Sequence, residues 1–215
     1  MEEEGKMIRN IIFDATNVLF EFNKNNLIYR CGATSSNYDI LEDEIFNKVM
    51  PLLYAGLIDK KEAVKMSCIS LLNSGNNDLV PVCLAIYDKL SSFLKINENM
   101  LDLVSSLRVT GYKCYILSNA VDDLICSLNE MKSKKGNFLL FNACMLSCNE
   151  RLLKPSFAIF EKFCYVNKLE ATECLYIDSD VKNLDIAKKL GMNCYDFKGY
   201  DKFKEFLIKE NMILY

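Results

Sequence analysis

Four short segments of this chain carry side chains that could do chemistry, and three of these segments are the ends of apolar runs. Asp14 ends the first run, and Asp178 ends the last. Between them, Ser118 and Asn119 end a third run, and Lys154 stands before a proline. If the runs are parallel strands of one sheet, their carboxyl ends meet at one edge, where ligands bind in such folds. The order of these residues therefore predicts one shared site built around carboxylates.

Each of these residues also has an ordinary structural explanation. An aspartate after a strand often caps a helix or starts a turn, and Asn183 could likewise cap the helix that it is expected to begin. A lysine at the start of a helix, such as Lys154, is commonly exposed to solvent. It is the ordered set, and not any single residue, that favours Asp14 as a nucleophile.

The elements that would position these residues follow from the apolar pattern. Residues 8 to 14 are apolar without alternation, as expected of a strand that is buried on both faces of a parallel sheet. Further strands are expected near residues 113–118, 143–147, 174–178 and 193–197, with helices near 120–131, 155–167, 183–190 and 201–210. Alternating strands and helices imply an α/β fold with a Rossmann-like parallel sheet and helices on both faces.

A helical insert interrupts this alternation after the first strand. Ile45, Val49 and Leu53 share one helical stripe, and Asp59 is placed to cap a helix that carries Val64 and further apolar residues. We therefore expect a core domain of residues 1–18 and 95–215, and a small all-α cap domain of residues 19–94.

Bulk composition limits the classes of partner. Of the 215 residues, 51% are apolar and 26% are charged, as is typical of soluble globular proteins. No apolar stretch approaches the roughly 18 residues needed to cross a bilayer, and the acidic start does not resemble a secretory signal. A net charge of −3 gives no electrostatic reason to bind nucleic acid. We expect a cytoplasmic protein with neither a membrane nor a nucleic-acid partner.

Cysteine and histidine usage narrows the chemistry further. The ten cysteines are scattered singly through apolar segments, which predicts reduced, buried thiols instead of a zinc cluster or a disulfide scaffold. The chain contains no histidine, which excludes histidine-dependent serine or cysteine hydrolases and imidazole-ligated metals. Any general acid or general base must therefore be a carboxylate, a lysine, a tyrosine or water.

The ordered set of Asp, Ser-Asn, Lys-Pro and Asp-x-Asp resembles the motifs of the haloacid dehalogenase-like (HAD-like) hydrolase superfamily. The resemblance is strongest to its capped phosphatases, including sugar-phosphatase-like members and the amino-terminal phosphatase domain of soluble epoxide hydrolases. The spacing from Asp178 through Asn183 to Gly191 is the most specific match, and the resemblance covers nearly the whole chain.

This resemblance implies hydrolysis of phosphate monoesters. Asp14 would attack phosphorus and form an aspartyl-phosphate. Ser118 and Asn119 would donate hydrogen bonds to the phosphoryl oxygens, and Lys154 would neutralise charge on both the nucleophile and the phosphate.

A magnesium ion belongs to the same expectation. A carboxylate that attacks a phosphate dianion faces repulsion, so a hard cation is expected between them, and Mg²⁺ prefers oxygen ligands. The resemblance implies Asp14, Asp178 and the backbone carbonyl of Thr16 as ligands. Asn183 could orient metal-bound waters, and Asp180 is either an exposed charge at the helix entry or a substitute ligand.

Three positions depart from the family pattern. Most phosphatases of the superfamily carry a second aspartate two residues after the nucleophile, which acts as general acid and then as base, and Thr16 stands there. Threonine cannot carry that proton, a loss worth roughly 10²–10⁴-fold in rate. Ser179 replaces a second consecutive aspartate, which would weaken magnesium binding, and Ser156 replaces an acidic residue after the Lys-Pro pair.

Three interpretations of the function remain open. The leading one is a magnesium-dependent phosphatase acting on a small phosphorylated metabolite that the cap encloses. The second is a catalytically weak or inactive relative that binds a phosphorylated ligand or partner, which Thr16 and Ser179 favour. The third is a 2-haloacid dehalogenase, in which Asp14 would attack carbon without a metal. The substrate and the oligomeric state stay open, and the cap offers only candidate contacts, namely Asn23, Asn25, Tyr29, Arg30 and Tyr54.

Overall fold

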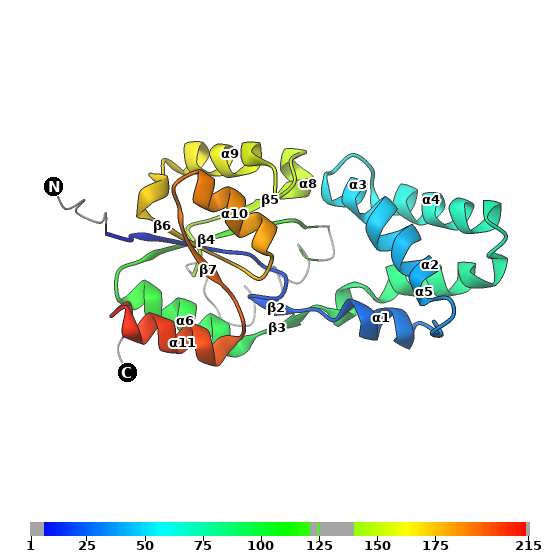
Figure 1. Cartoon of the computed structure of the whole chain (residues 1–215), viewed down its shortest axis with the longest axis horizontal. Helices are drawn as coiled ribbons and strands as arrows, with labels where there is room; N and C mark the ends of the chain where they lie inside the picture. The colour runs from blue at the N-terminus through cyan, green and yellow to red at the C-terminus, as the bar shows by residue number, and fades with distance from the viewer. Residues whose placement is uncertain (1–6, 121–123, 125–139, 214–215) are drawn as a thin grey trace.

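A parallel sheet of five strands forms the centre of the molecule (Figure 1). The computed structural model describes residues 7–120, 124 and 140–213. The strands lie in the order β5-β4-β1-β6-β7, and all four pairings are parallel. They are β1 (Asn10–Phe13), β4 (Lys113–Ser118), β5 (Ala143–Leu146), β6 (Cys174–Asp178) and β7 (Asn193–Asp196).

The register of the central strands aligns their carboxyl ends. Phe13 of β1 pairs with Ile116 of β4 on one side and with Ile177 of β6 on the other. Asp14, which follows β1, therefore lies level with the last residues of both neighbouring strands. The side chains at the carboxyl ends of these three strands therefore lie together at one edge of the sheet.

Helices cover both faces of the sheet, because consecutive strand residues point to opposite faces. Ile11 and Phe13 belong to one apolar cluster, with α6 (Glu98–Val109) and α11 (Tyr200–Lys209). Ile12 belongs to the cluster on the other face, with α9 (Phe157–Asn167) and α10 (Val181–Lys189). Figure 1 shows these pairs of helices on opposite sides of the strands. The predicted α/β fold with a Rossmann-like parallel sheet is confirmed.

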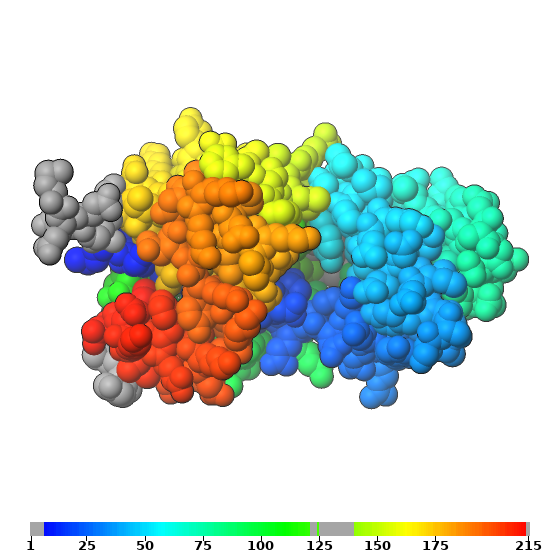
Figure 2. Space-filling view, in the orientation of Figure 1, coloured from blue at the N-terminus to red at the C-terminus, as the bar shows by residue number. Residues whose placement is uncertain are grey.

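A helical lobe lies beyond the carboxyl edge of the sheet (Figures 1 and 2). Its elements are α1 (Lys24–Arg30), α2 (Tyr38–Leu41), a π-helical stretch (Glu42–Val49), α3 (Met50–Tyr54), α4 (Lys60–Asn73) and α5 (Val80–Lys89), with short 3₁₀ turns at Asn77–Leu79 and Ser91–Phe93. The fully buried apolar residues of the lobe form their own cluster, which runs from Leu27 to Leu90. The lobe is therefore packed separately from the sheet.

Two short strands connect the lobe to the sheet. β2 (Phe20–Glu21) and β3 (Lys95–Ile96) pair antiparallel, so the chain enters and leaves the lobe side by side. Leu19 and Phe20 still pack in the apolar cluster of the sheet. In the remaining connections, α8 (Ser147–Glu150) follows β5, and a 3₁₀ turn (Ala171–Glu173) precedes β6.

Several predicted boundaries are shifted. The first strand is shorter than residues 8 to 14, and the helix expected from Pro155 begins at Phe157 after Ser156, whose backbone is extended. The helix expected from Asn183 begins two residues earlier, because Asp180 caps it by accepting a hydrogen bond from Lys182 N at 2.9 Å. The helix expected near 120–131 lies almost entirely outside the described residues.

The expectation of buried thiols is only partly correct. None of the nine cysteines in the described part of the chain forms a disulfide, and Cys83, Cys114 and Cys174 are buried. Cys144 is exposed, and the other five are half-buried, because they pack at the margins of the apolar clusters. Among the described residues, none of the helices combines the length and apolar character that a membrane span needs.

The cap of α6 gives a test of local stability near the junction between the lobe and the sheet. Asn97 Oδ1 accepts a hydrogen bond from Met100 N at 3.2 Å. We expect Asn97→Ala to lower the free energy of unfolding by about 1 kcal/mol, because the first turn loses its side-chain acceptor. Urea denaturation measures this change. Asn99→Ala, at an exposed position in the same turn, is the control, and an equal loss in both variants would contradict the assignment of the cap.

Candidate active site

Asp14 lies at the centre of a buried polar cluster at the carboxyl edge of the sheet. Its backbone N–H donates to Ile177 O at 2.9 Å, which fixes the residue beside β6. Its side chain is 11% exposed, and Oδ1 accepts hydrogen bonds from Ser118 Oγ at 2.7 Å and from Lys154 Nζ at 2.8 Å. No other described residue donates to Oδ2 of this carboxylate, so one oxygen is held and the other is left for a ligand.

Lys154 reaches this carboxylate from the loop that precedes α9. Its Nζ also donates to Asp178 Oδ2 at 2.9 Å and to Tyr176 Oη at 2.8 Å. Asn119 fixes the backbone of the lysine, since its Nδ2 donates to Lys154 O and its Oδ1 accepts from Lys154 N, both at 2.9 Å. The bond between Lys154 and Pro155 is a cis peptide. The side chain of Asn119 is thus occupied in positioning the lysine, and its role as a phosphate donor stays a prediction.

Asp178 is the second carboxylate of the cluster and is almost fully buried. Its Oδ2 accepts from Lys154 Nζ, from the hydroxyl of Tyr176 and from Asn183 Nδ2, the last at 2.9 Å. Its Oδ1 accepts only from Asp180 N, at 2.8 Å. Asn183 therefore lies against the site one turn into α10, and the possibility that it caps this helix is wrong.

The charges of the cluster follow from burial and from the lysine. Burial raises the pKa of Asp14, and the attraction of Lys154 offsets only part of this effect. Burial also acts on Asp178, but there the attraction of Lys154 and the hydrogen bond from Tyr176 outweigh it and lower the pKa. Burial lowers the pKa of Lys154, yet the two carboxylates outweigh burial, so that pKa is raised. Asp178 and Lys154 are therefore charged at neutral pH, and Asp14 is the more easily protonated carboxylate.

Tyr176 belongs to the cluster although sequence reasoning did not select it. It precedes Asp178 by two residues on β6, so both side chains point to the same face of the strand. Burial and the neighbouring Asp178 raise its pKa well above the usual value, which keeps the hydroxyl protonated as a donor. Strand periodicity was the signal that could have found it.

The remaining predicted site residues lie around this cluster. Thr16 is half-buried in the loop between β1 and β2, and Ser179 is half-buried after Asp178. Asp180 is exposed and caps α10. The structure brings Asp14, Ser118, Lys154, Asp178 and Asn183 together through direct hydrogen bonds to the two carboxylates or the lysine, whereas Asp180 contributes its backbone N–H.

The donor atoms of this cluster fit a hard cation. Asp14 Oδ2 is free of donors from the described residues, and Asn183 Oδ1 is buried without a hydrogen-bond partner. Searched over the described residues, the chain has no group of three or more His, Cys, Asp or Glu side chains that could hold a metal. Two carboxylates with carbonyl oxygens and water suit Mg²⁺, which usually binds proteins through one or two carboxylates and keeps several waters.

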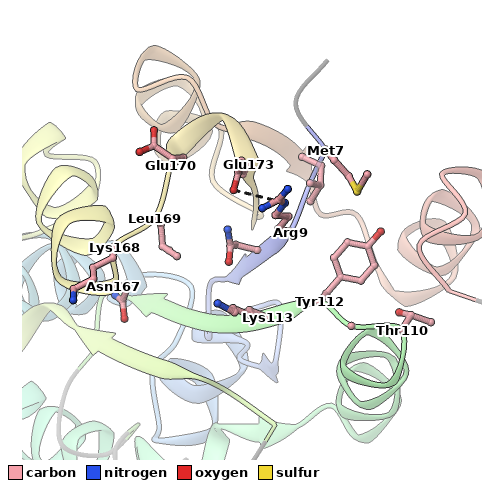
Figure 3. A pocket seen from close by; sticks show the side chains of 13 residues that line it. Met7, Arg9, Thr110, Tyr112, Lys113, Asn167, Lys168, Leu169, Glu170 and Glu173 are labelled. Carbon is pink, nitrogen blue, oxygen red and sulfur yellow. Dashed lines mark ion pairs between the residues drawn. The ribbon is translucent and has the colours of Figure 1, made fainter. Parts of the chain in front are cut away.

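A wide hollow lies at the opposite edge of the sheet (Figure 3). Segments around the amino ends of β1 and β4 line it, and within it Arg9 pairs with Glu173 at 4.0 Å. Lys113 and Lys168 are drawn on its walls in the same view. Because ligands of parallel α/β sheets bind at the carboxyl ends of the strands, this hollow has no part in the site around Asp14.

The sheet, its two helical layers and the lobe inserted after β1 define a Rossmann-like α/β protein with a polar site beneath a helical lobe. No protein-family model matches the chain, and no curated protein is significantly similar to it. Solved structures are similar, and three of them are informative. A predicted HAD-like family hydrolase from Porphyromonas gingivalis has a TM-score of 0.73 and 25% identity, over 94% of this chain and 98% of its own.

The second is a HAD family enzyme from Bacteroides thetaiotaomicron in complex with magnesium and inorganic phosphate, with a TM-score of 0.66 and 23% identity, over 89% of this chain and 94% of its own. The third is an L-2-haloacid dehalogenase from Xanthobacter autotrophicus, with a TM-score of 0.59 and 18% identity, over 94% of this chain and 83% of its own. The chain has the fold of the HAD-like hydrolase superfamily, which confirms at that level the resemblance carried by its motifs.

The hydroxyl of Tyr176 gives a test of the cluster. We expect Tyr176→Phe to lower the free energy of unfolding by roughly 1.5–3 kcal/mol, because hydrogen bonds to two charged groups are lost while the ring volume is kept. Tyr115→Phe is a matched control: Tyr115 packs edge-on against Phe163 as Tyr176 does against Phe160, and no described residue bonds its hydroxyl. Chemical denaturation of both variants measures the difference, and similar losses would show that the Tyr176 hydroxyl adds nothing.

Proposed function

We propose that this protein is a magnesium-dependent phosphatase that hydrolyses small phosphate monoesters through an aspartyl-phosphate on Asp14. The observation that carries the proposal is the buried carboxylate of Asp14, which has Lys154 and Ser118 on one oxygen and no described donor on the other. Such a carboxylate is oriented, charge-compensated and without a described hydrogen-bond donor on one oxygen, as suits a nucleophile. The similar enzyme that was solved with magnesium and phosphate supports the same chemistry.

Each residue of the cluster has a role in this proposal. Asp14 Oδ2 attacks phosphorus, the bond to the leaving-group oxygen breaks, and water then hydrolyses the aspartyl-phosphate to release phosphate. Lys154 and Ser118 hold Oδ1 and offset the charge that gathers between nucleophile and phosphate. Asn119 and Tyr176 position the lysine, the first through its backbone and the second at Nζ.

Magnesium would be held by Asp14, Asp178 and the Thr16 carbonyl, with Asn183 beside them. When bound, the ion supplies positive charge that offsets repulsion between the carboxylate and the phosphate dianion. The need for it follows from the cluster, because two carboxylates and one ammonium leave a net negative charge where a dianion must bind. Ser179 and Asp180 remain candidate supporting residues, and the lobe of α1–α5 is proposed to act as the cap.

Because Thr16 stands where the general acid usually is, no carboxylic acid at this position can protonate the leaving group. In this proposal water or a weaker acid protonates the leaving oxygen, so turnover is slow. The expected substrate is a small phosphorylated metabolite. The proposed location is the cytoplasm, where cysteines that form no disulfides stay reduced.

The role of Asp14 is tested with a generic aryl phosphate, with and without Mg²⁺. We expect magnesium-dependent turnover that falls by roughly 10³-fold or more in Asp14→Asn, because the amide cannot form the intermediate. Asp185→Asn, which changes an exposed carboxylate on α10, is the control and should keep the activity. Equal turnover in the natural protein and in Asp14→Asn would rule out the assigned nucleophile.

The role of Thr16 is tested by restoring the missing acid. We expect Thr16→Asp to raise kcat by roughly 10²-fold, the lower end of what general acid–base catalysis contributes. Thr16→Asn has nearly the same shape without the acid and should leave kcat close to that of the natural protein. Steady-state kinetics with alkyl phosphates, whose leaving groups need a proton, measure the effect. An unchanged rate in Thr16→Asp with intact magnesium binding would contradict this account.

Two other functions would give different results in the same assays. A weak or inactive protein that binds a phosphorylated ligand or partner would show magnesium-dependent phosphate binding but no turnover, and Thr16 and Ser179 favour that outcome. A 2-haloacid dehalogenase would release halide from 2-chloropropionate without metal. The structural likeness to a haloacid dehalogenase favours testing it.

A further inference from the structure

A small cavity lies between the lobe and the loops that follow Asp14 and Ser118. Its described lining residues come from both parts of the molecule and are Thr16, Phe22, Tyr54, Leu90, Leu94, Asn119, Ala120 and Leu124. Thr16 follows Asp14 by two residues, and Asn119 directly follows Ser118. The group attached to a phosphate held at Asp14 therefore has this cavity beside it.

The lining of this cavity is apolar and carries no charge among the described residues. Five of its eight described residues have hydrocarbon side chains, and the three with polar atoms, Thr16, Tyr54 and Asn119, are neutral. The side chain of Asn119 is already bonded to the backbone of Lys154. Few hydrogen-bonding groups are thus left for a substrate.

A second hollow near the same edge of the sheet has the opposite character. Asn17, Glu21, Asn97, Ser179 and Asp201 are among the residues that line it. Its two carboxylates disfavour a phosphate ester that already carries negative charge. The apolar cavity is therefore the better receptor for the leaving group.

The walls of the apolar cavity are held together by one buried hydroxyl. Ser147 Oγ accepts a hydrogen bond from Ala120 N at 3.0 Å and donates one to Tyr54 O at 2.6 Å. Nearby, Gly56 adopts φ +62, and a Cβ at this position would lie 2.0 Å from Cys148 O, so the lobe approaches α8 closely. The core wall and the lobe wall are thus fixed at a short separation, and the cavity admits only a compact group.

We propose that the leaving group of the substrate is a compact, uncharged and largely apolar alcohol. This inference rests on the proposed phosphatase function. A sugar would bring several hydroxyls into the cavity, and a phosphorylated amino acid would bring an ammonium and a carboxylate. Buried polar groups without partners are costly, and buried charges without partners cost more. An aliphatic alcohol brings no unpaired polar or charged group into the cavity, and burial of its apolar surface favours binding.

The test compares esters that differ only in polarity. Propyl phosphate and glycerol 3-phosphate share a three-carbon chain, and glycerol adds two hydroxyls. We expect kcat/KM for propyl phosphate to exceed that for glycerol 3-phosphate by tenfold or more, with O-phosphoserine and glucose 6-phosphate slower still. Equal or faster turnover of glycerol 3-phosphate, phosphoserine or glucose 6-phosphate would overturn the inference.

Acetyl phosphate separates this inference from the function on which it rests. Its leaving group needs neither a proton nor the cavity, so its magnesium-dependent hydrolysis reports the aspartyl-phosphate chemistry alone. Hydrolysis of acetyl phosphate without preference for propyl phosphate overturns only the assignment of the leaving group. No hydrolysis of acetyl phosphate overturns the phosphatase function and this inference with it.

A substitution in the lining of the cavity tests whether the preference for propyl phosphate arises there. We expect Leu94→Asn to reduce the ratio of propyl to glycerol turnover by about tenfold, because the amide offers a partner to hydroxyls. Leu84→Asn, at an exposed position on α5, is the control and should keep the ratio. If Leu94→Asn loses acetyl phosphate turnover through misfolding, Phe22→Tyr adds one hydroxyl to the same wall. An unchanged ratio in the folded variant would overturn the assignment.

Discussion

The structure around the site depends on one ammonium group buried between two carboxylates. Lys154 Nζ lies 2.8 Å from Asp14 and 2.9 Å from Asp178, and all three side chains are shielded from water. Two opposite unit charges about 4 Å apart interact by roughly 4 kcal/mol at the effective dielectric constant of a protein site. Removing one partner of such a pair typically costs about 3–5 kcal/mol, because a buried charge is left uncompensated. The lysine therefore fixes both carboxylates in place.

This contact constrains elements that are distant in the sequence. The carboxylates can share one ammonium only if β1 and β6 end at the same level, as their register ensures. The lysine can reach them only if its loop is drawn against the end of β4, and Asn119 does this through two hydrogen bonds to the lysine backbone. The geometry of the site and the register of the sheet therefore depend on each other.

The lobe adds a second surface to the site. It has its own apolar cluster and meets the sheet through the paired strands β2 and β3 and through the contact between Ser147 and Tyr54. The first connection follows the chain, while the second joins residues that lie far apart in sequence. Together they set the width of the space beside Asp14, where the substrate is proposed to bind.

The sequence by itself determined the sheet, the insert and the kinds of chemistry open to the protein, because these depend on local properties. Uninterrupted apolar runs mark strands buried on both faces, and the lack of histidine leaves carboxylates and lysine for catalysis. Only the tertiary structure decided that Tyr176 joins the cluster, that Asn119 holds the lysine backbone, and that Asp180 instead of Asn183 caps α10. Tyr176 and Asn119 act through partners 22 and 35 residues away, and a capping position depends on where the strand before it ends. Such contacts arise only when the chain has folded, so residue type and spacing could not reveal them.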